Sequence, residues 1–220
     1  MIVITGFGPY GRTAVNPSWL AARAVAGAGP VAGMPVQAVE LPVEYARLEG
    51  EIQALLTRHK PRAVVSLGLW PGEACVRLEK TAANLLDFEI PDNAGALVQN
   101  RAVAEGDVGG FITRAPVKEM CRQLLDDGIP ARVSYSAGSF LCNAVSYITS
   151  KAIRDLGLDT VFLFVHVPYE PEQVAALIRE TPSLGLELHQ RADLASMSRD
   201  TVVRALTTIV ARLADDAARS

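Results

Sequence analysis

Three apolar segments, each bounded by turn residues, constrain the fold of this chain more than any other feature. They cover residues 2–5, 63–67 and 160–165, and continuous apolar runs of this length are typical of strands that are buried on both faces. Apolar residues at helical spacing lie between these runs, as in the segment 45–55. Because buried strands alternate with amphipathic helices, the sequence predicts an α/β fold, a three-layer α/β/α sandwich with a largely parallel, twisted sheet.

The composition indicates one domain that does not bind nucleic acid or membranes. Of the 220 residues 50% are hydrophobic, and no linker-like segment divides them, so we expect one domain over residues 1–220. The net charge is −3 and the basic residues are scattered, a pattern that disfavours nucleic acid and anionic membranes. No signal peptide or membrane span is recognisable, so we expect a cytoplasmic protein with three reduced cysteines.

A strand, a turn and a helix are predicted around Cys142. Residues 133–135 alternate as in a strand, residues 137–138 form a turn, and Ser139 is the expected N-cap of a helix. Cys142 then lies in the first helical turn, where free backbone N–H groups and the helix dipole favour a thiolate over a thiol. The residues alone leave a second interpretation open, because free cysteines also pack in cores as small hydrophobic residues.

His166 is the candidate base for such a nucleophile. It directly follows the apolar segment 160–165, and open α/β sheets place their chemistry at the C-terminal ends of central strands. The alternative is a core histidine that is hydrogen-bonded to backbone. His59 lies at the polar end of a predicted helix and is expected to be solvated, while the pattern around His189 predicts nothing specific.

Residues 6–11 match the G-x-G-x-x-G pattern of dinucleotide-binding folds and follow a predicted strand. Two features disfavour a nucleotide site. The next helix is predicted to begin only after Asn16, its N-cap, and the first acidic residue is Glu40, later than the pattern requires. The alternatives are a glycine-rich turn and a loop that offers Phe7 and Tyr10 to an apolar ligand.

The segment 73–95 has no regular pattern, and irregular stretches of this kind in compact domains are often functional loops. It contains Glu79, which nothing in the local pattern distinguishes from an ordinary solvated carboxylate. Residues 97–115 receive no assignment.

Seven short motifs extend over almost the whole chain. In order they are Ile-Thr-Gly-Phe-Gly-Pro-Tyr-Gly at 4–11, Asn-Pro-Ser-Trp at 16–19, Glu-Leu-Pro at 40–42, Glu-Lys-Thr-Ala-Ala-Asn at 79–84, Ile-Pro-Asp-Asn-Ala-Gly at 90–95, Ser-Tyr-Ser-Ala-Gly-Ser-Phe-Leu-Cys-Asn at 134–143 and Phe-Val-His-Val-Pro-Tyr at 164–169. With them the chain resembles the pyroglutamyl peptidase I (pyrrolidone-carboxylate peptidase) family of cysteine peptidases. The most specific of these motifs contain Cys142 and His166.

The resemblance implies a catalytic role for three residues. Cys142 would be the nucleophile, His166 the general base and then acid, and Glu79 the carboxylate that orients His166, a division of labour that suits acyl transfer. The implied reaction is hydrolysis of the amide bond after an N-terminal pyroglutamyl residue, through a thioester acyl-enzyme. The family implies no metal and no organic cofactor.

The resemblance also implies a pocket for the lactam ring of N-terminally pyroglutamylated peptides, a cytoplasmic location and a homotetramer. An apolar pocket suits a flat, uncharged ring and disfavours a free glutamate, whose charge would lose its hydration. The substrate-binding residues expected on this basis are Phe7, Tyr10, Asn16, Leu69, Ile90, Phe140 and Leu141.

Several positions depart from the family pattern. Leu69 stands where a glutamine is usual and cannot hydrogen-bond a lactam, Pro71 replaces a glycine and Glu73 an arginine. Glu89 replaces an arginine that is thought to stabilise the oxyanion. The sequence leaves open whether Arg77 or Lys80 supplies the missing cation. Two alternatives therefore accompany the peptidase: a related cysteine amidohydrolase with altered acyl or lactam specificity, and a weakly active or non-catalytic binding homologue.

Overall fold

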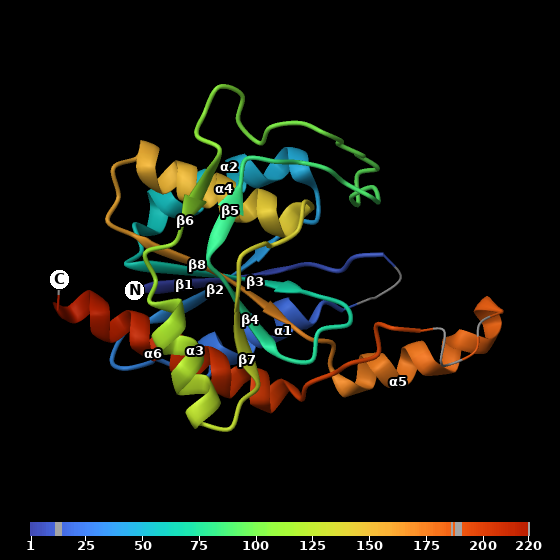
Figure 1. Ribbon diagram of the computed structural model, residues 1–220. Coiled ribbons are helices and arrows are strands. Elements are labelled where there is room, and N and C mark those ends of the chain that lie inside the picture. Colours follow the sequence, from blue (N-terminus) through green and yellow to red (C-terminus); the bar gives the residue numbers. More distant parts are fainter. Residues whose placement is uncertain (12–14, 186, 188–190, 220) are drawn as a thin grey trace.

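A six-stranded sheet forms the centre of the computed structural model, which describes residues 1–11, 15–185, 187 and 191–219 (Figure 1). The strands β1, β2, β3 and β8 run parallel, whereas β4 is antiparallel to β8 and parallel to β7. The sheet order is β2-β1-β3-β8-β4-β7, with bounds of Ile2–Phe7 for β1, Val36–Leu41 for β2, Ala63–Leu69 for β3, Val76–Glu79 for β4, Ala131–Ser134 for β7 and Val161–Val167 for β8.

Helices cover both faces of this sheet, each with its own hydrophobic core (Figure 1). Side chains alternate between the two faces along every strand, so Leu163 and Val165 of β8 join one core and Phe162 and Phe164 the other. One face carries α1 (Pro17–Gly27), α3 (Val117–Asp126) and α6 (Arg199–Arg219), and the other carries α2 (Tyr45–His59) and α4 (Leu141–Asp155).

This arrangement confirms the predicted three-layer α/β/α sandwich with a mostly parallel sheet. The remaining helix, α5 (Pro171–Glu180), continues into a short 3-10 helix at Thr181–Leu184. It lies beside the segment between β1 and α1, where Gln173 Nε2 donates to the Val15 carbonyl at 3.2 Å. No described helix has the length and apolar character needed to cross a membrane.

Two local predictions were wrong around the start of α4. Phe140, not Ser139, is the N-cap, because the Ser139 hydroxyl donates instead to the Asp87 carbonyl at 2.7 Å. Strand β7 ends at Ser134, and Tyr135 is exposed. Cys142 still lies in the first turn of the helix, as predicted.

The unassigned segment 97–115 contains the strand β6 (Gly110–Ile112), which pairs with β5 (Thr81–Ala83) in a separate antiparallel ribbon. The rest of the segment is a long loop that projects past α2 and α4 in Figure 1. Strand β6 was not predicted because its pairing partner, β5, is about 30 residues away in sequence, and no local pattern marks it as a strand.

The entry into α1 is fixed by a close approach between helix and sheet. Asn16 caps the helix and accepts from the Ser18 backbone N–H at 3.1 Å, with Pro17 at the first helical position, as predicted. The helix start presses onto β1 at Gly6, where a Cβ atom would lie 2.6 Å from the backbone of Ser18. Only glycine permits this contact.

We expect Gly6→Ala to lower the free energy of unfolding by about 2–3 kcal/mol, because the backbone of α1 must move away to admit the methyl group. Gly50, an exposed residue inside α2 with no neighbour within 4 Å of an added Cβ, provides the matched control. Gly50→Ala should raise the same free energy by about 0.5–1 kcal/mol. Urea unfolding of both variants measures the difference, and equal stabilities would contradict the close approach.

Candidate active site

Cys142 is presented to a pocket by the first turn of α4 and is half-buried there. Its sulfur lies directly over Gly68 of β3, where an added Cβ would come within 2.8 Å of Sγ and 2.9 Å of the Phe164 ring. Gly68 is the penultimate residue of the strand. A glycine inside a buried strand is a signal of close approach by another group.

His166 is fully buried near the end of β8, in register with Gly68 of the neighbouring strand. Its Nδ1 lies 2.8 Å from Glu79 Oε1. Because the carboxylate accepts this hydrogen bond, Nδ1 carries the proton and Nε2 is left as the basic nitrogen. Nε2 has no hydrogen-bond partner within the described ranges. The ring packs between Trp70 and Phe164, with centroid distances of 4.8 Å to each.

Glu79 is the last residue of β4 and is buried. Because β4 runs antiparallel to β8, Glu79 pairs with Phe164 and lies on the same face as His166, one diagonal step away. The carboxylate also lies 3.2 Å from Arg77 Nε, an ion pair between two buried side chains. The fold thus brings His166 and Glu79 together from strands that are about 90 residues apart in the chain, while the Cys142 sulfur lies over Gly68, the residue of β3 that is in register with His166.

The protonation of the pair differs from the prediction. Burial, together with the Glu79 charge, raises the pKa of Cys142 to about 12, and the Cys142 backbone N–H lowers it by less. Burial also lowers the pKa of His166, against the opposing effect of its hydrogen bond to Glu79. The free protein therefore holds a neutral thiol beside a neutral imidazole, because desolvation outweighs the helix N-terminus.

A pocket of about 400 Å³ opens beside Cys142. Its walls are mainly aromatic and aliphatic, and they come from the ends of β1, β3 and β8, the start of α4, and α5. The residues that line the pocket are Phe7, Tyr10, Gly11, Asn16, Val43, Leu69, Pro71, Ile90, Phe140, Leu141, Cys142, Tyr169 and Leu177. All seven residues that were predicted to bind substrate are among them.

The loop 90–95 is hydrogen-bonded to the start of α2 and to the loop after β1, and these contacts hold one wall of this pocket in place. Buried Asp92 accepts from the backbone N–H groups of Tyr45, Ala94 and Ala96 at 2.7–2.9 Å. On the other side the Tyr10 hydroxyl donates to the Pro91 carbonyl at 3.2 Å. Tyr10 also packs on Phe140, with ring centroids 5.7 Å apart.

Two asparagines organise the backbone around the site. Asn16 lines the pocket, but its amide is engaged in the cap of α1 and donates to the Gly8 carbonyl at 3.0 Å. Asn143, to which the sequence analysis gave no role, is buried next to Cys142. Its Oδ1 accepts from the Ala83 backbone N–H, and its Nδ2 donates to the carbonyls of Ala83 and Leu85, all at 2.9 Å. These hydrogen bonds connect α4 to the end of β5 and the loop that follows it.

The cations that might have replaced the missing arginine lie elsewhere. Lys80 Nζ donates to the Thr113 carbonyl at 2.8 Å, and Arg77 is buried beside Glu79; neither lines the pocket. Glu89 is exposed and forms no ion pair within the described ranges. His59 ends α2, and His189 lies outside the described residues. Within the same ranges no group of three or more potential metal ligands is present.

Comparison with known proteins agrees with the geometry. The family model for pyroglutamyl peptidase matches residues 1–215. The chain is 36% identical to the pyrrolidone-carboxylate peptidase of Pseudomonas fluorescens over 187 residues, which cover 85% of this chain and 86% of that protein.

Solved structures agree as well. A variant of the pyrrolidone carboxyl peptidase of Pyrococcus furiosus superimposes with a TM-score of 0.88 at 27% identity, over 98% of each chain. Pyroglutamyl peptidase I of Bacillus amyloliquefaciens gives a TM-score of 0.85 at 28% identity, over 97% of this chain and 96% of that one. The full-length match, the shared fold and the sequence identity lead to one assignment: the chain belongs to the pyroglutamyl peptidase family of cysteine peptidases.

Proposed function

We propose that this protein hydrolyses the amide bond that follows an N-terminal pyroglutamyl residue, with Cys142 as nucleophile, His166 as general base and acid, and Glu79 as the group that orients His166. The observation that carries the proposal is the joint position of these side chains. A thiol in the first turn of α4 opens on an apolar pocket and lies over Gly68, and the histidine in register with Gly68 is buried with Nδ1 of its ring held by a carboxylate.

The neutral resting pair defines the first chemical step. As Cys142 Sγ attacks the carbonyl carbon, its proton passes to His166 Nε2, and the imidazolium that forms is stabilised by Glu79. The negative charge on the carbonyl oxygen is met by free N–H groups in the first turn of α4, the turn that also carries Cys142.

The remaining steps return the protein to its starting state. The C–N bond breaks as Nε2 gives its proton to the leaving amine, and the pyroglutamyl group remains on sulfur as a thioester. His166 then takes a proton from water, the hydroxide oxygen attacks the thioester, and pyroglutamate leaves as Sγ is protonated again. No step needs a metal or a cofactor.

The character of the pocket supports a neutral, cyclic acyl group. Phe7, Tyr10 and Phe140 supply aromatic faces, while Ile90 and Leu141 add aliphatic ones. Such walls hold a flat lactam by contact and penalise a charged amino acid, because its charge would lose hydration without gaining a partner. Asn16 stabilises the wall through its bond to Gly8.

A related cysteine amidohydrolase with altered acyl specificity is the second candidate. The observation that favours it is Leu69, which lines the pocket and offers no hydrogen bond to a lactam. Hydrolysis of pyroglutamyl amides compared with that of other acyl amides discriminates between the candidates. As the resemblance implies, we also propose a homotetramer in the cytoplasm, where the three free thiols stay reduced.

We expect Cys142→Ala to reduce kcat on a fluorogenic pyroglutamyl amide by more than about 10³-fold, because no other group can form the thioester. The matched control is Cys121→Ala, which removes a buried thiol from α3 on the opposite face of the sheet. The control should retain the activity of the unaltered protein. Full activity of Cys142→Ala would refute the mechanism.

We expect Glu89→Arg to raise kcat by about 10-fold or more, because position 89 precedes the pocket residue Ile90 and a guanidinium there adds a donor for the oxyanion. Glu105→Arg makes the same charge change at an exposed site in the loop 97–109 and serves as the control. Steady-state kinetics on the same substrate measure both. If the two variants behave alike, position 89 does not act on the oxyanion.

The acid limb of kcat/KM should lie below pH 6.5, the ordinary pKa of histidine. Activity requires neutral His166, and burial lowers the pKa of this imidazole. The base therefore remains unprotonated as the pH falls past 6.5 and is lost only as the pH passes its lowered pKa. A profile measured between about pH 4 and pH 9 tests this, and an acid limb above 6.5 would contradict the neutral pair.

A further inference from the structure

We propose that Arg77 is a positioning residue for this reaction: it holds Glu79, and through Glu79 the ring of His166, in the orientation that catalysis needs. The part of this proposal that concerns turnover rests on the proposed function. Arg77 does not line the pocket and is not placed to touch substrate.

The central contact joins Arg77 to the oxygen that orients His166. Arg77 Nε lies 3.2 Å from Glu79 Oε1, the same atom that accepts from His166 Nδ1 at 2.8 Å. The exposed fractions of the Arg77 and Glu79 side chains are 7% and 1%, so water cannot take over either contact. Residues 77 and 79 alternate with 78 along β4, which puts both side chains on the face of the sheet that carries His166.

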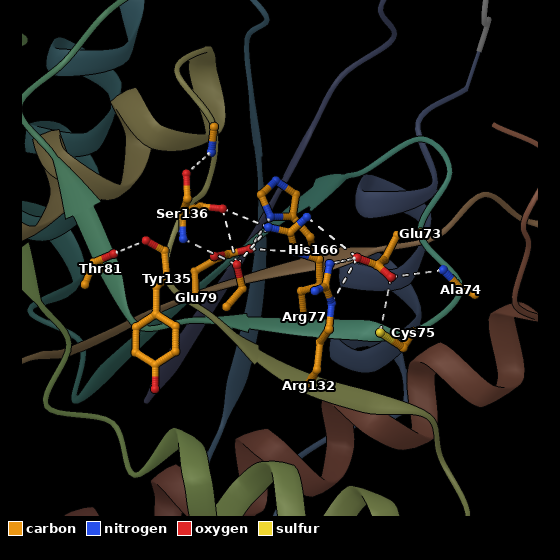
Figure 2. A network of polar contacts seen from close by, with 12 residues as sticks. Glu73, Ala74, Cys75, Arg77, Glu79, Thr81, Arg132, Tyr135, Ser136 and His166 are labelled. Atoms are coloured by element: carbon orange, nitrogen blue, oxygen red, sulfur yellow. Dashed lines mark hydrogen bonds and ion pairs between the residues drawn. The ribbon is translucent and has the colours of Figure 1, made fainter. Parts of the chain in front are cut away.

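Arg77 is itself held from three directions, as Figure 2 shows. Its Nη2 donates to Ser134 Oγ at 2.7 Å and to the Ser136 carbonyl at 2.8 Å. Its Nη1 lies 3.6 Å from Glu73 Oε2, and the Glu73 carboxylate also accepts from Arg132 Nε at 3.2 Å. A guanidinium fixed in this way can define the position of the carboxylate beside it.

A second route leads from Arg77 to the imidazole through Trp70. The Arg77 guanidinium lies over the Trp70 ring, 3.8 Å from its centroid, and the Trp70 ring in turn packs edge-to-face on His166 at 4.8 Å. Arg77 therefore contacts both the hydrogen-bond partner of His166 and one of the two rings that enclose it. Its removal would loosen the imidazole on two sides.

The charge of Arg77 also balances the site. Glu79 raises the pKa of Cys142, whereas Arg77 lowers it. For His166, Arg77 lowers the pKa, and Glu79 and Glu73 raise it. With Arg77 neutralised, the negative charge of Glu79 would oppose deprotonation of the thiol without the opposing charge of the guanidinium.

The decisive experiment is a double-mutant cycle in the full chain. We expect Arg77→Gln to lower kcat on a pyroglutamyl amide by about 10- to 100-fold with little change in KM. In a Glu79→Gln background the same substitution should lower kcat by a clearly smaller factor, because the main group through which Arg77 acts is absent and only the contact through Trp70 and the direct effect of its charge remain. Independent, multiplicative effects, or an unchanged kcat in Arg77→Gln, would overturn the proposal.

Arg77→Lys provides the conservative arm and keeps the test decisive if Arg77→Gln folds poorly. A lysine retains the charge but not the fork that reaches Glu79 and Ser134 together. Its kcat should lie between those of the unaltered protein and Arg77→Gln, and in Glu79→Gln it too should have a clearly smaller effect. The surface control is Arg47→Gln, which removes an exposed arginine that pairs with Glu51 on α2 and should leave kcat unchanged.

Alkylation of Cys142 by iodoacetamide supplies a readout that needs no substrate. Removal of the Arg77 charge raises the pKa of the thiol, so the alkylation rate at pH 8 should fall in Arg77→Gln. Peptide mass spectrometry assigns the label to Cys142 and excludes Cys75 and Cys121. An unchanged alkylation rate in Arg77→Gln would overturn the role of Arg77. If the unaltered protein is alkylated at Cys142 but does not hydrolyse the pyroglutamyl amide, the proposed function is refuted instead.

Discussion

The hydrogen bond between Glu79 and His166 is the interaction on which the rest of the site depends. It lies in the interior, where a charged carboxylate is costly unless it is paired. The fold meets this condition by reversing one strand. Because β4 runs against β8, a carboxylate at the end of one strand lies diagonally across from the histidine near the end of the other, and Arg77, two residues earlier, supplies the opposite charge.

The position of the nucleophile depends equally on a missing side chain. Helix α4 can lay the Cys142 sulfur on the sheet at the level of His166 only because Gly68, in register with His166, has no side chain there. Asn143, the next residue along the helix, anchors the same turn to the backbone after β5. The proposed nucleophile and the proposed base are thus placed by regular elements, which are more rigid than loops.

The sequence predicted the layers, most helices and the residues Cys142 and His166, because these features follow from local patterns: apolar runs, helical spacing and the position of a residue within its element. Glu79 was found only through the family resemblance, since β4 is short and its role depends on pairing with a strand about 90 residues away. Arg77 was considered only as a replacement for the arginine that is missing at position 89, and its position beside Glu79 was not predicted. The charge state of Cys142 was predicted wrongly, because burial is a property of the folded chain and here outweighs the helix dipole.

The high pKa of Cys142 has a consequence for the lifetime of the protein in oxidising conditions. Because its pKa lies far above neutral pH, the sulfur is held almost entirely as a thiol at pH 7. Peroxide attacks the thiolate and hardly the thiol, so the first step toward sulfenic acid is slow in the free protein. The sulfur becomes a strong nucleophile only while a carbonyl is in place and His166 accepts its proton. A site of this design separates the ability to cleave an amide from vulnerability to oxidation.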